Sequence, residues 1–248
     1  MSQAYKKQKG FTMVELMLAM AFVAVLLILI AVSIIYISRI YNKGITIREL
    51  NQVGRTVSDD LLRSVSESMP FEDNYIKIDS DRGYFCTGRY TYVWNTGRIL
   101  SVIHERYTYA NVSENEKDNI SNKIRLARFT DTDAQMCRYG ISDNQSDNQS
   151  DEKVQLLKEQ SIELLSSGDR DIAVQDFSIK KIASGSVNSQ ALYLIEFTLG
   201  TNDARTLNAD RNSCLAPGDI DKNAADSTDA NYCAVNSFSI VARAGSKI

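Results

Sequence analysis

The sequence predicts an α+β protein in which a long N-terminal helix packs on an antiparallel β-sheet head. Two observations carry this prediction. No charged residue occurs between Leu16 and Ile37, and those 22 positions would form about 33 Å of helix, enough to cross a hydrocarbon layer of about 30 Å. From residue 71 onward the chain instead contains short segments rich in aromatic and β-branched residues, which are typical of strands.

The helix is expected to continue beyond its transmembrane half, residues 11–38, as an amphipathic half over residues 39–69. Apolar residues recur there at spacings of three and four, which places them on one face: Leu50, Val53, Val57, Leu61 and Val65. Charged residues fall on the other faces: Arg48, Arg55, Asp59, Asp60 and Arg63. We expect Asp59 and Asp60 to be solvated. The helix should end before Met69-Pro70, because helical geometry is disfavoured ahead of a proline.

The head is expected over residues 70–248 as one antiparallel sheet with polar insertions, packed on the amphipathic half of the helix. The expected strands cover residues 84–85, 90–94, 100–109, 123–129, 172–179, 193–199 and 237–243. A short helix is expected over residues 151–167, and Ser184–Gln190 would be a turn. Residues 143–151 repeat Asp-Asn-Gln-Ser and indicate a solvated loop.

The start of the apolar segment carries the most specific motif in the chain. Residues 9–16 read Lys-Gly-Phe-Thr-Met-Val-Glu-Leu and follow Lys6 and Lys7. A carboxylate such as Glu15 is costly in lipid unless it is paired, so an ordinary membrane anchor would avoid it. Its presence therefore indicates a cationic partner. A cleaved secretory signal is excluded, because its apolar region would be shorter and would end in a small-x-small cleavage site.

These residues resemble the N-terminus of the type IV pilin and type II secretion pseudopilin superfamily, and the resemblance covers about residues 6–38. That family has a short basic leader ending in Gly, then an apolar residue, then Glu at the fifth mature position. The resemblance implies a leader over residues 1–10, cleavage between Gly10 and Phe11, N-methylation of Phe11 and a pilin fold. It also implies that Glu15 pairs with the N-terminal ammonium of a neighbouring subunit, which would set the register of assembly.

The resemblance further implies the partners and the location of the chain. The partners would be other pilin subunits, a prepilin peptidase, an inner-membrane assembly platform, and membrane lipid before assembly. The chain would be a single-pass membrane protein with a cytoplasmic N-terminus and an extracytoplasmic head, and later part of a cell-surface filament. Basic residues do not set this orientation by count, since Lys6, Lys7 and Lys9 precede the helix and Arg39, Lys43 and Arg48 follow it.

Several functional hypotheses are open at this point. The large head favours a minor pilin, present in few copies, over a major pilin, and a secretion pseudopilin is a further alternative. A rival from another class is an exported enzyme or binding protein held by a simple anchor. No catalytic constellation stands out, and the lone histidine, His104, is interpreted as a packing or surface residue. We therefore expect a structural subunit and not an enzyme.

Charge and cysteine content bear on the partners and the compartment. The formal net charge is −3 and becomes −6 once a leader with three lysines is lost, which argues against direct binding of nucleic acid. Four cysteines all follow the helix, and an even count in an exported domain favours disulfides. Three connectivities are possible, of which we favour Cys214–Cys233, closing a short C-terminal loop, with Cys86–Cys137.

An acidic stretch near the C-terminus is the one candidate metal site. Alternating oxygen-bearing side chains are typical of calcium loops, and here they are Asp219, Asp221, Asn223 and Asp226. The stretch departs from an EF-hand loop at Ala224, where glycine is usual, and at Ala230, where glutamate is usual. The alternative is an acidic surface loop, and no other cofactor is expected.

Overall fold

The computed structural model describes residues 10, 12–102, 106–110, 112–113, 116, 119, 122–141, 153–165, 171–184, 190–216 and 232–245. The chain divides into two compact units, Met1–Asn42 and Lys43–Ile248. Several predictions concern residues outside the described ones: the leader up to residue 9, Phe11, His104, the loop at 143–151, the turn after Ser184 and the four proposed calcium ligands.

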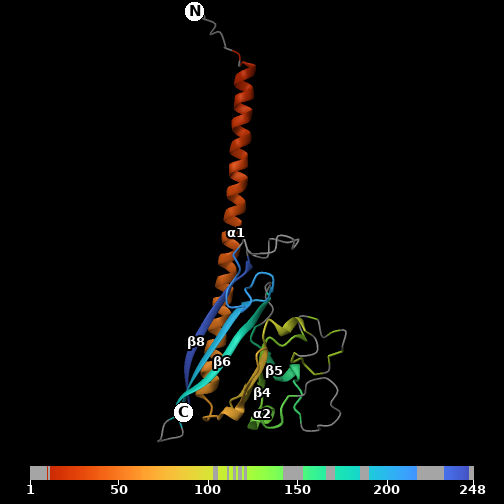
Figure 1. The fold of residues 1–248 in the computed structure, drawn as a ribbon, viewed down its shortest axis with the longest axis vertical. Helices are drawn as coiled ribbons and strands as arrows, with labels where there is room; N and C mark the ends of the chain where they lie inside the picture. The colour runs from red at the N-terminus through yellow and green to blue at the C-terminus, as the bar shows by residue number, and fades with distance from the viewer. Residues whose placement is uncertain are drawn as a thin grey trace, which may run out of the picture. The chain divides into compact units, whose positions relative to one another are not determined.

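Helix α1, Met13–Ser66, contributes to both units (Figure 1). Within the first unit none of its described residues is buried. Within the second unit it buries one face, formed by Thr46, Leu50, Gly54, Val57, Leu61, Ser64 and Val65. The predicted apolar face is therefore confirmed, and the helix ends ahead of Pro70 as the sequence predicts.

Five short strands form the first antiparallel sheet of the head. They follow the order of the chain: β1 Ile76–Ile78, β2 Arg82–Cys86, β3 Tyr90–Asn95, β4 Leu126–Thr130 and β5 Ser161–Glu163. A short helix, α2 Gln135–Tyr139, follows β4, and 3-10 turns occur at Asp73–Tyr75, Ile99–Ser101, Thr132–Ala134 and Lys158–Gln160. The aromatic and β-branched composition of β2 and β3 explains why the sequence predicted these strands correctly.

Three long strands form the second sheet, in the order β6 Ile172–Ser184, β7 Ala191–Thr201 and β8 Val235–Ala244. Figure 1 shows them crossing the head portion of α1. A bulge falls at Gln175, because Val174 pairs with Leu199 and Asp176 with Thr198. An extra residue reverses which side chains face the core, so the buried positions change from Ile172 and Val174 to Phe177 and Ile179.

One apolar core joins α1 to both sheets. Leu61 and Val65 of the helix, Phe85 and Trp94 of the first sheet, and Phe197 of the second are all almost fully buried. A column of aromatic rings crosses the boundary between the sheets, with ring centroids 4.3 Å apart for Trp94 and Phe177 and 5.8 Å for Phe177 and Phe197. The column extends to Phe238 on β8, which packs directly against Gly54 of α1.

The expectation of a single sheet is wrong, and so is the expectation of a strand over residues 100–109. The described part of that stretch begins in a 3-10 turn and otherwise contains an isolated bridge between Thr108 and Lys123. The reason is the side chain of one buried residue on β3. The side-chain amide of buried Asn95 donates to the carbonyls of Tyr107 and Ile124 and accepts from the N–H of Tyr107, so it replaces a backbone ladder.

The helix expected over residues 151–167 is also wrong. Within its described residues the chain forms a 3-10 turn and then β5, which pairs with the edge of β4. The helix was expected from an apolar face that included Val154 and Leu165. These two residues enter different places, since Val154 packs against a second core cluster and Leu165 belongs to the main core. Tertiary packing and strand pairing therefore override the helical pattern.

Candidate functional site

The N-terminal end of α1 contains a capping box. The carboxylate oxygen Oε2 of Glu15 accepts hydrogen bonds from the backbone N–H and the hydroxyl of Thr12, each at 2.9 Å, and the N–H of Glu15 donates to the Thr12 hydroxyl at 3.3 Å. Thr12 and Glu15 thus satisfy each other at the first turn, where backbone N–H groups lack helical partners. Glu15 also lies at the positive end of the helix dipole, which favours a negative charge.

Sequence reasoning singled out Glu15 but missed Thr12. The signal was available, because a Thr followed three residues later by Glu ahead of an apolar run is the sequence signature of a capping box. Gly10 is exposed, and the cleavage partner Phe11 lies outside the described residues. The structure therefore places Glu15 and Thr12 together and leaves the processing residues as predictions.

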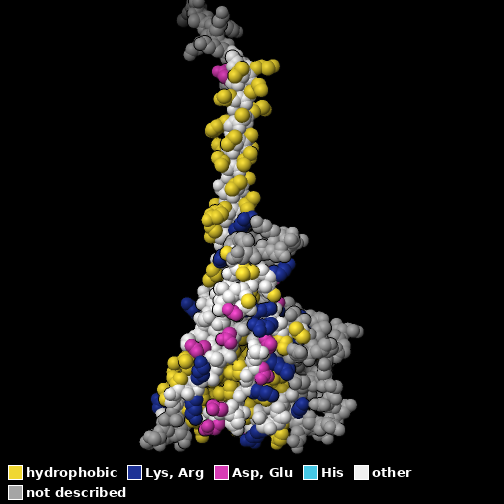
Figure 2. Space-filling view, viewed as in Figure 1, with side chains coloured by type: hydrophobic (Ala, Val, Ile, Leu, Met, Phe, Trp, Pro, Cys, Tyr) yellow, Lys and Arg dark blue, Asp and Glu magenta, His cyan; other side chains and the backbone are white. Residues whose placement is uncertain are grey.

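An unbroken apolar surface follows this cap. In the first unit the large apolar side chains are exposed on every face of α1, for example Leu29 at 63% and Phe22 at 67%. Figure 2 shows hydrophobic side chains, in yellow, all along this part of the helix. Among the described residues, α1 is the one helix long and apolar enough to cross a membrane. A surface of this kind must be covered by lipid or by other protein.

Asp60 is not solvated, which corrects the sequence prediction. It accepts a hydrogen bond from the Tyr92 hydroxyl at 2.8 Å and forms an ion pair with Arg128, and the side chains of Asp60 and Arg128 are each only about one-fifth exposed. Burial, reinforced by the nearby Asp60 charge, raises the pKa of Tyr92. This network joins α1 to β3 and β4, so the residue positions the helix on the first sheet. Asp59 is exposed, as expected.

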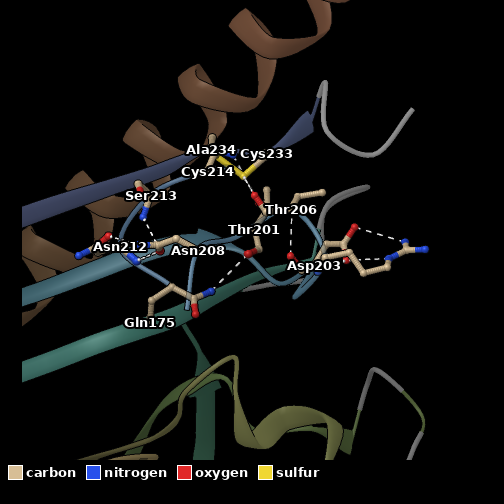
Figure 3. The surroundings of a disulfide bond; sticks show 11 residues. Gln175, Thr201, Asp203, Thr206, Asn208, Asn212, Ser213, Cys214, Cys233 and Ala234 are labelled. Atoms are coloured by element: carbon tan, nitrogen blue, oxygen red, sulfur yellow. Dashed lines mark hydrogen bonds and ion pairs between the residues drawn. A yellow bond between two sulfur atoms is a disulfide. The ribbon is translucent and has the colours of Figure 1, made fainter. Parts of the chain in front are cut away.

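The head contains two disulfides, and their pairing is the one that we expected. Cys86 joins Cys137 and thereby connects β2 to α2, while Cys214 joins Cys233 just ahead of β8. Figure 3 shows the second bond among polar contacts: the Thr206 hydroxyl donates to the Asp203 carbonyl, and the amide oxygen of Asn208 accepts from the N–H groups of Asn212 and Ser213. This bond ties Cys214 to a residue two positions ahead of the start of β8.

A shallow groove of about 600 Å³ runs along the exposed face of α1 and is lined by Gly44, Ile47, Arg48, Asn51, Gln52, Arg55, Thr56 and Asp59. Within this lining the Thr56 hydroxyl donates a hydrogen bond to the Gln52 carbonyl at 3.1 Å. Within the described ranges no three His, Cys, Asp or Glu side chains gather as metal ligands.

Comparison with protein-family models, curated proteins and solved structures finds no match to this chain.

Proposed function

We propose that this chain is a structural subunit of a type IV pilus-like filament, and that it acts as a minor pilin. One observation carries the proposal: a Gly10-Phe11 junction lies directly before an acid-capped helix whose first unit exposes apolar side chains on all faces. A simple membrane anchor needs the apolar surface but has no use for Glu15 at its edge. A subunit that moves from lipid into a filament needs both the apolar surface and the Glu15 carboxylate.

The proposed sequence of events follows from the chemistry of the two ends of this segment. A prepilin peptidase removes residues 1–10 on the cytoplasmic side, and the new amine of Phe11 is methylated. The helix stays in the membrane until an assembly platform draws it into the filament. There the N-terminal ammonium of one subunit pairs with Glu15 of the next. An unpaired charge in apolar surroundings costs free energy, and pairing offsets that cost only when the two subunits are in register. Thr12 holds the carboxylate in place at the helix end.

The head supports the minor-pilin assignment. It is a helix face packed against antiparallel sheets and tied by two disulfides, which is the layout expected of a pilin head in an oxidising compartment. The first sheet, with its own second core cluster, is a large addition to the three-stranded sheet next to the helix. A subunit of a densely repeated shaft gains nothing from such an addition, whereas a subunit present in few copies can carry it.

Substitution of Glu15 tests this role. The Glu15→Ala variant should insert into the membrane normally but lose incorporation into sheared filaments by tenfold or more, measured by immunoblotting of the filament and membrane fractions. The matched control is Asp59→Ala, which removes one negative charge from an exposed position of the same helix and should be incorporated normally. Normal incorporation of Glu15→Ala would refute the pairing of Glu15 with a neighbouring amine.

A further inference from the structure

The continuous apolar segment of α1 is followed by a short collar of polar-tipped side chains. Tyr36 and Tyr41 are 65% and 67% exposed, and Arg39 between them is exposed as well. These tyrosines are the first two in the described part of the helix, and Arg39 is its first cation. Tyrosine and arginine combine an apolar stem with a polar end, so they suit a boundary between hydrocarbon and water.

The spacing along the helix matches the thickness of a bilayer. From Glu15 to Arg39 the helix rises about 36 Å at ~1.5 Å per residue. The hydrocarbon core of a bilayer is about 30 Å thick, and the headgroup regions bring the total to about 40–45 Å. When Glu15 lies at one boundary, the collar therefore lies at the opposite one. Tyr36 and Tyr41 are separated by about 7.5 Å along the axis, which is similar to the depth of one headgroup layer.

The arrangement around the helix favours a bilayer over a protein groove. At about 100° per residue, Tyr36 and Tyr41 lie about 140° apart around the axis, and Arg39 lies about 60° from Tyr36 on the other side. The three side chains are therefore spread around the helix and do not share one face. A groove on a single protein partner would contact one face, whereas a flat interface that surrounds a spanning helix contacts every face at the same depth.

We propose that Tyr36, Arg39 and Tyr41 bind the headgroup layer of a phospholipid bilayer and set the depth of the helix before assembly. Arg39 would pair with lipid phosphate, for which its planar fork of donors is suited. The two tyrosines would place their rings below the phosphates and their hydroxyls toward water. This inference rests on the membrane stage of the proposed function, but it requires neither cleavage of the leader nor formation of a filament.

Depth-dependent quenching of tryptophan fluorescence tests the collar. The full chain, carrying Tyr36→Trp or Tyr41→Trp, would be reconstituted into vesicles of phosphatidylcholine and phosphatidylglycerol with bromine placed either near the headgroup or near the chain end. The native Trp94 is 1% exposed in the head core, so the wild-type protein supplies its background signal. Leu26→Trp, at the middle of the apolar segment, is the matched control for a deep position.

We expect the shallow bromine to quench both collar variants at least twofold more strongly than the deep bromine, and the reverse for Leu26→Trp. Adding Arg39→Leu to Tyr36→Trp should move the tryptophan deeper and reduce the shallow-to-deep ratio about twofold, whereas Arg39→Lys should preserve it. Collar variants that match Leu26→Trp, or that respond to neither lipid, would overturn the proposal. So would a ratio that Arg39→Leu leaves unchanged. Analysis of the mature N-terminus tests the filament role separately.

Discussion

Residues 13–42 and 43–66 of α1 belong to one continuous helix, but their apolar side chains meet different surroundings. In the first part, Leu29 and its neighbours are exposed. In the second part, Leu50, Val57 and Leu61 are at most 1% exposed, and the outward face is charged. The comparison shows that residues 43–66 are stabilised by packing within the chain. Residues 13–42 must instead be stabilised by lipid or by other subunits.

The largest effect should come from deleting a leucine in the second part. Leu61→Ala removes a fully buried side chain from the core and should lower the free energy of unfolding of the head by about 2–5 kcal/mol. Denaturant unfolding followed by Trp94 fluorescence would measure it. Leu29→Ala, the same change in the exposed part, should leave the unfolding of the head unaltered. A similar loss for both would contradict the distinction between the two parts.

The next effect concerns the link between α1 and the first sheet. Asp60→Ala leaves Arg128 without this ion pair and removes the carboxylate that accepts from Tyr92, in a site only about one-fifth exposed. We expect a loss of about 2–3 kcal/mol in the free energy of unfolding, because a largely buried charge loses its partner. The exposed Asp59→Ala should change stability little. Equal effects of the two variants in chemical denaturation would argue against this link.

Two glycines of the same helix sharpen the comparison further. A Cβ at Gly54 would lie 2.0 Å from the ring of Phe238, so Gly54→Ala should destabilise the head by about 1–3 kcal/mol. Nothing lies within 4 Å of a Cβ at Gly44, so Gly44→Ala should instead stabilise it by about 0.5–1 kcal/mol through helix propensity. Thermal unfolding of both variants measures the effects, and a shift of the same sign in both would show that contact with Phe238 is not decisive.

The smallest effect is a dependence on pH. Burial raises the pKa of Glu163, although its carboxylate accepts hydrogen bonds from the N–H groups of Arg125 and Leu126. An acid whose pKa is raised by folding favours the folded state when protonated. Its contribution is thus present below the ordinary pKa, near 4.3, and is lost as the pH rises through the folded value. Unfolding titrations should show this slope in the wild type and a flatter one in Glu163→Gln. An identical slope would exclude Glu163 as its source.

The sequence predicted the parts of the fold that depend on local pattern. The apolar face of α1, its end before Pro70, and strands β2, β3, β6, β7 and β8 all follow from side-chain periodicity and turn residues. The cysteine pairing, one choice among three, also agrees with the structure. The helix and the strands follow from short-range rules or from a strong alternation over many residues, so a single sequence contains enough information to specify them.

The features that the sequence missed depend on contacts between distant residues. Asn95 replaces a strand ladder by bonding to Tyr107 and Ile124, and Asp60 is withdrawn from solvent by Tyr92 and Arg128. Leu157 and Leu164 have helical spacing, yet residues 161–163 between them form β5, which pairs with β4. At the candidate site the acid was recognised from its cost in lipid, but its capping partner Thr12 was overlooked although the motif is local.

The central claim, that this helix is built to leave the membrane for a filament, is tested most directly by the mass of the mature N-terminal peptide. The account predicts a chain that begins at Phe11 and carries one methyl group on its amine. A mature chain that retains residues 1–10, or that begins anywhere else, would contradict it.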